Sequence, residues 1–170
     1  PSLTKDVQPL KTEHYDACLA RYVSYASQFG YVKAIYQLGT VGDPGISDLD
    51  VAVIVDDVVD PLGINKLSVF QSQTDPLFRY VFLHDIYLFS ESSFKFLPYL
   101  NYADRLKILY GKNGSTPECK PAHREPLVIQ IIFDFVVSRL VQFQNFLNCQ
   151  KLGVRGLLVR ISSLRHSYNL

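Results

Sequence analysis

The sequence predicts a small mixed α/β (α+β) domain, in which a mixed sheet is flanked by helices, followed by a C-terminal helical unit. Three observations predict this class: an amphipathic helical pattern comes first, short β-rich apolar runs follow, and two long apolar segments with helical spacing end the chain. We place the α/β domain at residues 1–111, a linker at residues 112–126 and the helical region at residues 127–170.

The first predicted elements are a helix and a strand. Apolar residues recur at spacings of three and four over residues 12–29, and Gly30 follows as a stop signal. Residues 31–38 (YVKAIYQL) then suit a strand. Residues 39–47 are rich in Gly, Pro, Ser and Asp, which predicts a loop.

The middle of the chain supplies the remaining strands. Residues 49–55 (LDVAVIV) form a nearly continuous apolar run, which is typical of a strand covered on both faces. A weak helical signal covers residues 62–73. The next clear strand is predicted over residues 80–89 (YVFLHDIYLF), and residues 108–110 suit a short one.

The last third of the chain is predicted to be helical. The linker at residues 112–126 holds three prolines, and residues 127–150 form a strongly apolar helical pattern. A second helix begins at Gly153, and its polar face, which we expect to meet solvent or a partner, carries three arginines: Arg155, Arg160 and Arg165.

Composition excludes several classes of protein. Hydrophobic residues make up 48% of the chain and charged residues 19%, which is ordinary for a globular protein and outside the disordered range. No apolar run has the length of a transmembrane helix, and the first residues show no signal-peptide pattern. The three cysteines lack metal-ligand spacing. We therefore expect a cytoplasmic protein with free thiols and no membrane partner.

The net charge of +1 hides an asymmetry along the chain. Residues 1–104 contain 7 basic and 13 acidic residues, whereas residues 105–170 contain 10 basic and 3 acidic ones. An acidic part suited to cations thus precedes a basic part that could face phosphate. The alternative is two solvated surfaces whose charges offset each other.

Two carboxylates precede and begin the apolar run of the second strand. Asp48 and Asp50 project to the same side, because side chains alternate along a strand. Two carboxylates this close repel each other unless a cation neutralises them. Mg²⁺ prefers oxygen ligands and completes its shell with substrate phosphates and water. The pair therefore predicts a site for Mg²⁺ or Mn²⁺, and the alternative is two turn or capping residues.

Two other features accompany the pair. Gly39 and Thr40 end the preceding strand, where a glycine allows close approach of a ligand and the loop can donate to phosphate oxygens. Asp85 lies among apolar residues, where a buried carboxylate is costly unless it is paired or binds metal. If the strands are neighbours, three carboxylates converge and could hold two metal ions for phosphoryl displacement. The alternative for Asp85 is a strand-end position or an ion pair.

This order of Gly39-Thr40, Asp48-Leu49-Asp50 and a later Asp85 resembles the DNA polymerase beta-type nucleotidyltransferase superfamily, in its minimal form. The resemblance covers residues 12–111 in layout and implies a nucleotidyltransferase-like fold. It implies that the three aspartates, Asp48, Asp50 and Asp85, are metal ligands and catalytic residues, and that Asp85 also helps to activate the acceptor. It further assigns nucleotide binding to the loop residues Gly39, Thr40 and Ser47.

The expected activity is transfer of a nucleoside monophosphate from a nucleoside triphosphate (NTP) to an acceptor hydroxyl, with release of pyrophosphate and with Mg²⁺ or Mn²⁺ as cofactor. The acceptor stays open among a small molecule, a protein and a nucleic acid, and so does the oligomeric state. Only seven residues separate Thr40 from Asp48, fewer than is usual for the family. This short loop motivates the alternative of a nucleotide-binding or regulatory module without turnover.

Two other metal motifs share residues with this pattern. Asp-Leu-Asp also suits a glycosyltransferase that uses a nucleotide sugar, but such enzymes place a sizeable nucleotide-binding region before the motif, and 47 residues precede Asp48. His84-Asp85 is similar to the dyad of His-Asp phosphohydrolases. That dyad belongs on helices, whereas this pair lies in a strand-like run, so we reject that assignment.

Overall fold

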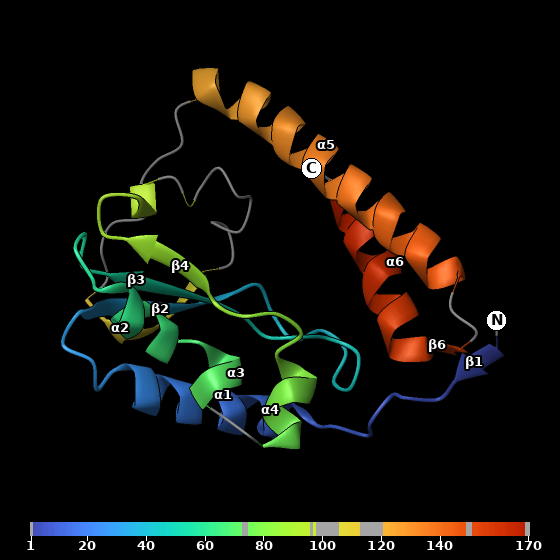
Figure 1. Ribbon diagram of the computed structural model, residues 1–170, viewed down its shortest axis with the longest axis horizontal. Coiled ribbons are helices and arrows are strands. Elements are labelled where there is room, and N and C mark those ends of the chain that lie inside the picture. The colour runs from blue at the N-terminus through green and yellow to red at the C-terminus, as the bar shows by residue number, and fades with distance from the viewer. Residues whose placement is uncertain are drawn as a thin grey trace.

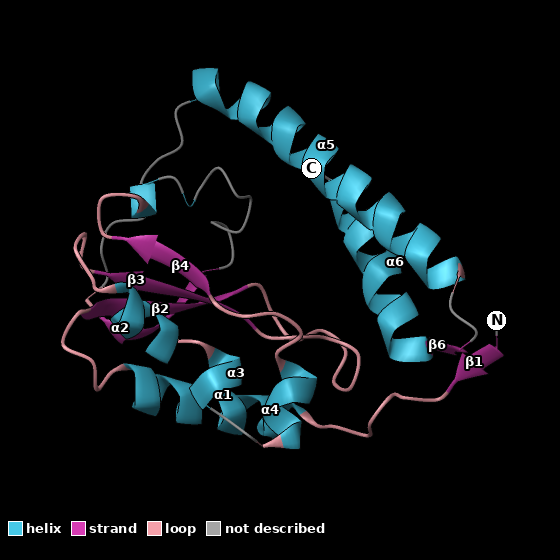
Figure 2. Cartoon of the chain, in the orientation of Figure 1, coloured by secondary structure: helices cyan, strands magenta, loops and turns pink. Residues whose placement is uncertain are grey.

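The centre of the molecule is a four-stranded mixed sheet with the strand order β4-β3-β2-β5 (Figures 1 and 2). In that order the strands are Tyr87–Ser90, Asp50–Val55, Val32–Leu38 and Leu106–Gly111. The computed structural model describes residues 2–72, 75–95, 97, 106–112, 121–148 and 151–168. A small mixed sheet flanked by helices is the fold class that the sequence predicts, and it is confirmed.

The pairing of the strands brings the loop ends together. Strand β2 is antiparallel to both β3 and β5, and β3 is parallel to β4. Leu38, the last residue of β2, lies opposite Asp50, the first residue of β3. The turn that begins at Gly39 therefore starts beside the Asp48–Asp50 segment.

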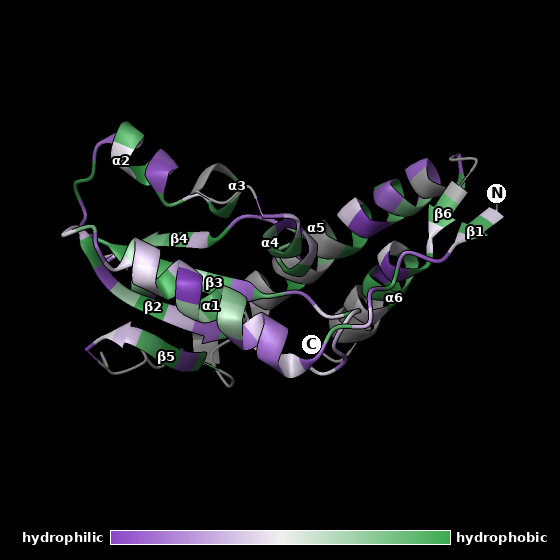
Figure 3. Ribbon diagram, turned by 90° about the horizontal axis from the view of Figure 1, so that it is seen from below, coloured by the Kyte–Doolittle hydropathy of each residue, from purple (hydrophilic) through white to green (hydrophobic). Residues whose placement is uncertain are grey.

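Helix α1 (Thr12–Ala26) covers one face of this sheet, as Figures 1 and 3 show. Its buried side chains recur at helical spacing: Tyr15, Cys18, Leu19, Tyr22 and Ala26. They pack in one core with Val51, Val53 and Val55 of β3, whereas Ala52 and Ile54 belong to a separate core on the other face. Because side chains alternate along a strand, Asp50 lies on the face away from α1.

Three short helices connect β3 to β4: α2 (Pro61–Lys66), α3 (Val69–Ser72) and α4 (Pro76–Val81). The predicted strand over residues 80–89 is therefore wrong in its first part, because α4 continues to Val81 and β4 begins at Tyr87. Asp75 caps α4 by accepting a hydrogen bond from the amide of Leu77 at 2.9 Å, and Pro76 occupies the first helical position. Asp60-Pro61 starts α2 in the same way.

The C-terminal part consists of α5 (Pro121–Leu147), β6 (Lys151–Gly153) and α6 (Val154–Tyr168), with the two helices packed on each other. Residues 121–126, which we predicted as the end of the linker, are helical, since a proline suits the first position of a helix. Residues 113–120 lie outside the described residues.

The start of the chain belongs with this C-terminal part. Strand β1 (Ser2–Thr4) pairs in parallel with β6, and Figure 1 shows both strands beside the lower end of α6. Sequence patterns do not predict this pairing, because its two strands are three residues long and lie 149 positions apart. Within the described ranges, no helix is both long enough and apolar enough to cross a bilayer.

Candidate functional site

Two carboxylates and one imidazole meet at the start of β3. One potential ligand atom from each of Asp48, Asp50 and His84 lies within 4.8 Å of the other two. Among the described residues, this is the group of His, Cys, Asp and Glu side chains whose ligand atoms converge in this way. Nε2 of His84 lies 2.6 Å from Oδ1 of Asp50. The structure thus brings together the predicted Asp48–Asp50 pair and adds a histidine.

The electrostatics of this group show strain between the carboxylates. Burial, and next the charge of Asp50, raises the pKa of the Asp48 carboxyl above its ordinary value. The hydrogen bond to Asp50 raises the pKa of His84 to about 9, against the opposing effect of burial. The imidazole is therefore positively charged at neutral pH, and it supplies the cation that two neighbouring carboxylates require.

The second ring nitrogen of His84 is also held. Its Nδ1 lies 2.6 Å from the carbonyl oxygen of Asp85. A histidine that donates from Nδ1 to a backbone carbonyl has its Nε2 lone pair available when Nε2 loses its proton, which is the usual arrangement of a metal-binding histidine. The donor set of Asp48, Asp50 and His84 therefore fits a divalent cation.

Asp85 is turned to other partners. Its Oδ1 accepts hydrogen bonds from the amides of Val69 and Ile86, each at 2.9 Å. Val69 belongs to the core that α1 covers, and the charge of Asp85 acts on the hydroxyl of Tyr22 on α1. Because Asp50 faces the opposite side of the sheet, this geometry does not bring Asp85 to the Asp48–Asp50 pair. The role of Asp85 as a third ligand stays a prediction from the sequence.

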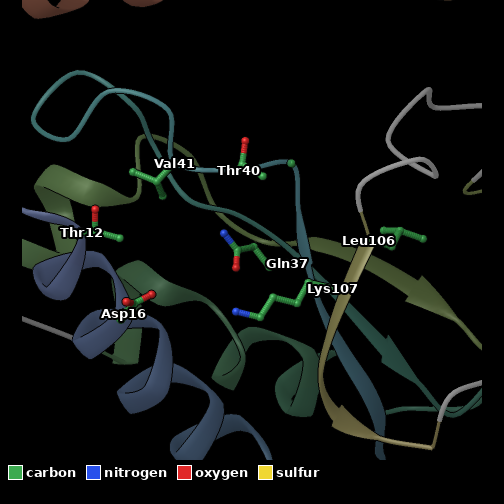
Figure 4. A pocket seen from close by; sticks show the side chains of 8 residues that line it. Thr12, Asp16, Gln37, Thr40, Val41, Leu106 and Lys107 are labelled. Carbon is green, nitrogen blue, oxygen red and sulfur yellow. The ribbon is translucent and has the colours of Figure 1, made fainter.

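Gly39 and Thr40 form a turn at the end of β2. Gly39 has a φ of 66°, a left-handed conformation that favours glycine. The turn borders a cavity of about 390 Å³, into which Asp16 of α1 and Lys107 of β5 also project (Figure 4). This cavity opens on the α1 side of the sheet and its lining does not include Asp48 or Asp50. Phosphate binding by this turn stays a prediction.

Ser47 is engaged within its own loop. Its hydroxyl accepts a hydrogen bond from the amide of Asp43 at 3.0 Å. Its carbonyl oxygen accepts one from the hydroxyl of Tyr15 at 2.9 Å and one from the guanidinium of Arg155 at 3.0 Å. In this arrangement Ser47 supports the loop that leads to Asp48, and a contact with nucleotide stays a prediction.

Arg155 differs from the sequence expectation. We predicted that it lies on a solvated or partner-facing side of the last helix, but only 5% of its surface is exposed. Its guanidinium carbon lies 3.9 Å from the centre of the Tyr80 ring, and its Nε donates to the carbonyl of Ile46 at 3.3 Å. A buried arginine with carbonyl and aromatic partners belongs to the interior, which helical periodicity alone did not indicate.

His84 is the functional candidate that the sequence reasoning did not select. In the sequence it stands out only as part of a dyad with Asp85, in a segment with a strand-like pattern. The structure shows an irregular segment between α4 and β4, in which neighbouring side chains need not alternate. A histidine immediately beside a predicted third acid was the available signal.

Comparisons with known proteins give weak structural likenesses. No family model and no curated protein matches the chain. One similar solved structure is a tri-AMPylated HEPN toxin from Shewanella oneidensis in complex with MNT antitoxin, with a TM-score of 0.36, 14% identity, and coverage of 79% of this chain and 96% of the other.

Two further solved structures are a toxin–antitoxin MntA–HepT (TM-score 0.35, 14% identity, 79% and 97% coverage) and a toxin–antitoxin with AMP-PNP (TM-score 0.35, 15% identity, 76% and 96% coverage). At these TM-scores the likenesses carry no weight for the activity of this chain.

Proposed function

We propose that this chain is a metal-dependent nucleotidyltransferase, which moves a nucleoside monophosphate from an NTP to an acceptor hydroxyl. The convergence of Asp48, Asp50 and His84 Nε2 supports this proposal above all. The group lies where β2 ends and β3 begins, beside a turn with a left-handed glycine. A cation site next to an open backbone turn is what a triphosphate substrate needs.

In the proposed reaction, the acceptor oxygen forms a bond to the α-phosphorus as the bond to the bridging oxygen breaks. Pyrophosphate leaves with the bonding electrons, and the acceptor proton passes to solvent. A bound divalent ion supplies charge neutralisation for the phosphates. Asp48 and Asp50 would hold that ion, and His84 would complete the donor set while its Nδ1 stays bound to the Asp85 carbonyl. The protein contributes mainly position and charge.

The donor set favours one ion over the other. Mg²⁺ takes oxygen ligands almost exclusively, whereas Mn²⁺ accepts an imidazole nitrogen more readily than Mg²⁺ does. Two carboxylates with one imidazole therefore suit Mn²⁺ better than Mg²⁺. We propose Mn²⁺ as the preferred ion of this site, with Mg²⁺ as a weaker substitute.

The turn at Gly39 and Thr40 is the proposed contact with the triphosphate. Gly39 is left-handed there, a conformation in which successive amides can face an anion, and Thr40 is exposed and carries a hydroxyl donor. Since Leu38 pairs with Asp50, phosphates that contact both this turn and the ion would lie at the edge of the sheet, and not in the cavity on the α1 side. The identity of the acceptor is left open by these residues.

The test uses NTP labelled in the α-phosphate, Mn²⁺ and pools of small-molecule, protein and nucleic-acid acceptors. Wild-type chain should transfer label and release pyrophosphate, and Asp50→Asn should abolish both. Asp56→Asn is the matched control, because Asp56 is an acid just beyond the other end of β3 that pairs with Lys33 at 2.8 Å. Full activity of Asp50→Asn would end the proposal.

A nucleotide-binding module without turnover is the second candidate. The observation in its favour is that His84 already neutralises Asp50, while Asp85 is held by backbone amides. Tight binding of NTP without pyrophosphate release from any acceptor pool would favour this candidate over transfer.

A further inference from the structure

We propose that Arg155 is a positioning residue, which holds the main chain before Asp48 and thereby sets the geometry of the cation site. This inference rests on the proposed function, because it concerns the same cation site. It assigns a role to the C-terminal helical part, which supplies none of the three converging side chains.

The contacts of Arg155 are directed at the two carbonyls that precede Asp48. Its Nε donates to the carbonyl of Ile46 at 3.3 Å and its terminal NH2 group donates to the carbonyl of Ser47 at 3.0 Å. The Ser47 carbonyl belongs to the same rigid peptide plane as the amide nitrogen and Cα of Asp48. Fixing this carbonyl therefore fixes the point from which the Asp48 side chain departs.

Two tyrosines hold the same short stretch from other directions. The hydroxyl of Tyr15 donates to the Ser47 carbonyl at 2.9 Å and accepts from the Gly45 amide at 2.9 Å. The hydroxyl of Tyr80 donates to the Gly45 carbonyl at 2.5 Å, and its ring stacks under the Arg155 guanidinium at 3.9 Å. Residues 45–47 are thus held by α1, α4 and α6 together.

Arg155 is itself placed by the first residues of the chain. Its amide donates to Oδ1 of Asp6 at 2.8 Å, and β1 pairs with β6 immediately before it. Gly153 permits this approach, because a Cβ at that position would overlap the Asp6 carboxylate. The N-terminal segment therefore fixes the start of α6, and the Arg155 side chain connects α6 to the loop before Asp48.

The planar guanidinium suits this task better than an ammonium group. Its fixed fork reaches two successive carbonyls at once while one face lies on an aromatic ring. A lysine would reach one carbonyl as a point charge and would lose the stacking. We therefore expect Arg155→Lys to keep part of the positioning effect on the loop before Asp48, and Arg155→Met to lose that effect.

The experiment measures Mn²⁺ binding to the full chain by electron paramagnetic resonance, well below the unfolding temperature of each variant. Arg155→Met should raise the Kd for Mn²⁺ about tenfold, the effect expected when a group that orients a ligand is removed. Arg155→Lys should fall between this variant and wild type. Arg79→Met is the matched control, since Arg79 is an exposed arginine that lines, together with Arg155 and Tyr80, a second cavity of about 400 Å³. The Kd of this variant should equal the wild-type value.

Tyr80→Phe covers the case in which Arg155→Met does not fold. It removes the hydrogen bond from the Tyr80 hydroxyl to the Gly45 carbonyl and the one from the Gln8 amide to that hydroxyl, but it keeps the ring under Arg155, and it should weaken Mn²⁺ binding. A folded Arg155→Met or Tyr80→Phe that binds Mn²⁺ with the wild-type Kd would overturn the proposal. Absence of Mn²⁺ binding by the wild-type chain would instead overturn the proposed function.

Discussion

Asp50 at the start of β3 and Asp85 before β4 are both carboxylates in apolar sequence, yet the structure satisfies them in different ways. Asp85 accepts two backbone hydrogen bonds at 2.9 Å, from the amides of Val69 and Ile86. Asp50 lies beside a second carboxylate, Asp48, and its partner is the His84 imidazole. Asp85 therefore satisfies backbone amides, whereas Asp50 belongs to a cluster of ionisable side chains.

This difference shows what distinguishes a structural acid from a candidate ligand. Backbone amides stay where the fold places them, so a carboxylate bound to them is already satisfied and gains little from an ion. Two carboxylates that share a partly buried site repel each other, and burial of Asp48 raises its pKa. Such a site gains stability when a cation binds it.

The largest expected effect comes from Asp48→Asn. The change removes a charged ligand, so Mn²⁺ affinity should fall by about 100-fold or more. It also removes the repulsion with Asp50, so the metal-free protein should gain about 1 kcal/mol of stability. Titration with Mn²⁺ and thermal unfolding without metal measure the two effects. A variant that loses stability without metal and keeps its Mn²⁺ affinity would show that the pair is structural.

The next effect is on the choice of ion. His84→Gln should raise the Kd for Mn²⁺ by about 10-fold, because it removes the imidazole donor. The Kd for Mg²⁺ should change much less, since Mg²⁺ relies on the carboxylates. Competition between the two ions, followed by calorimetry, gives both constants. Equal losses for the two ions would show that His84 acts as a general support and not as a ligand.

Asp85 should respond in stability and not in ion binding. Asp85→Ala leaves the amides of Val69 and Ile86 without their acceptor, which costs about 1–3 kcal/mol. Asp85→Asn should cost less, because its amide oxygen can still accept. Denaturant unfolding measures both, and the Kd for Mn²⁺ should stay at the wild-type value. Loss of Mn²⁺ binding in Asp85→Asn would instead support this residue as the third ligand that the sequence predicts.

The fold was predictable where its pattern is local. The helical spacing of α1 and the apolar run of β3 predict these elements to within a few residues. Helix α1 buries one stripe of side chains, and β3 buries side chains on both faces. The predicted strand over residues 80–89 takes in the last two residues of α4, because Tyr80 to Phe82 continue the apolar run, although Asp75-Pro76 is a helix-start signal. The β1–β6 pair depends on contacts across almost the whole chain and has no local signal.

The site was predictable to the same extent. The spacing of Asp48 and Asp50 places both carboxylates on one side of a strand, and this pattern is complete within three residues. The roles of His84 and Arg155 depend on where other segments pack against that strand. His84 contacts Asp50 from 34 positions away and Arg155 contacts Ser47 from 108 positions away. The Asp48-Leu49-Asp50 motif therefore predicts neither contact.

The smallest expected effect concerns the turn at Gly39 and Thr40, and it tests nucleotide binding by this turn independently of ion binding by the cluster. Thr40→Val removes the hydroxyl but keeps the β-branched shape, so one phosphate hydrogen bond of about 1 kcal/mol should be lost, roughly fivefold in the Kd for NTP. Mn²⁺ binding without nucleotide should not change, and Thr40→Ser should bind NTP as wild type does. Calorimetry with Mn²⁺ and NTP measures these values. If Thr40→Val binds NTP normally, the triphosphate contacts backbone amides or another part of the molecule, and the hydroxyl has no part in recognition.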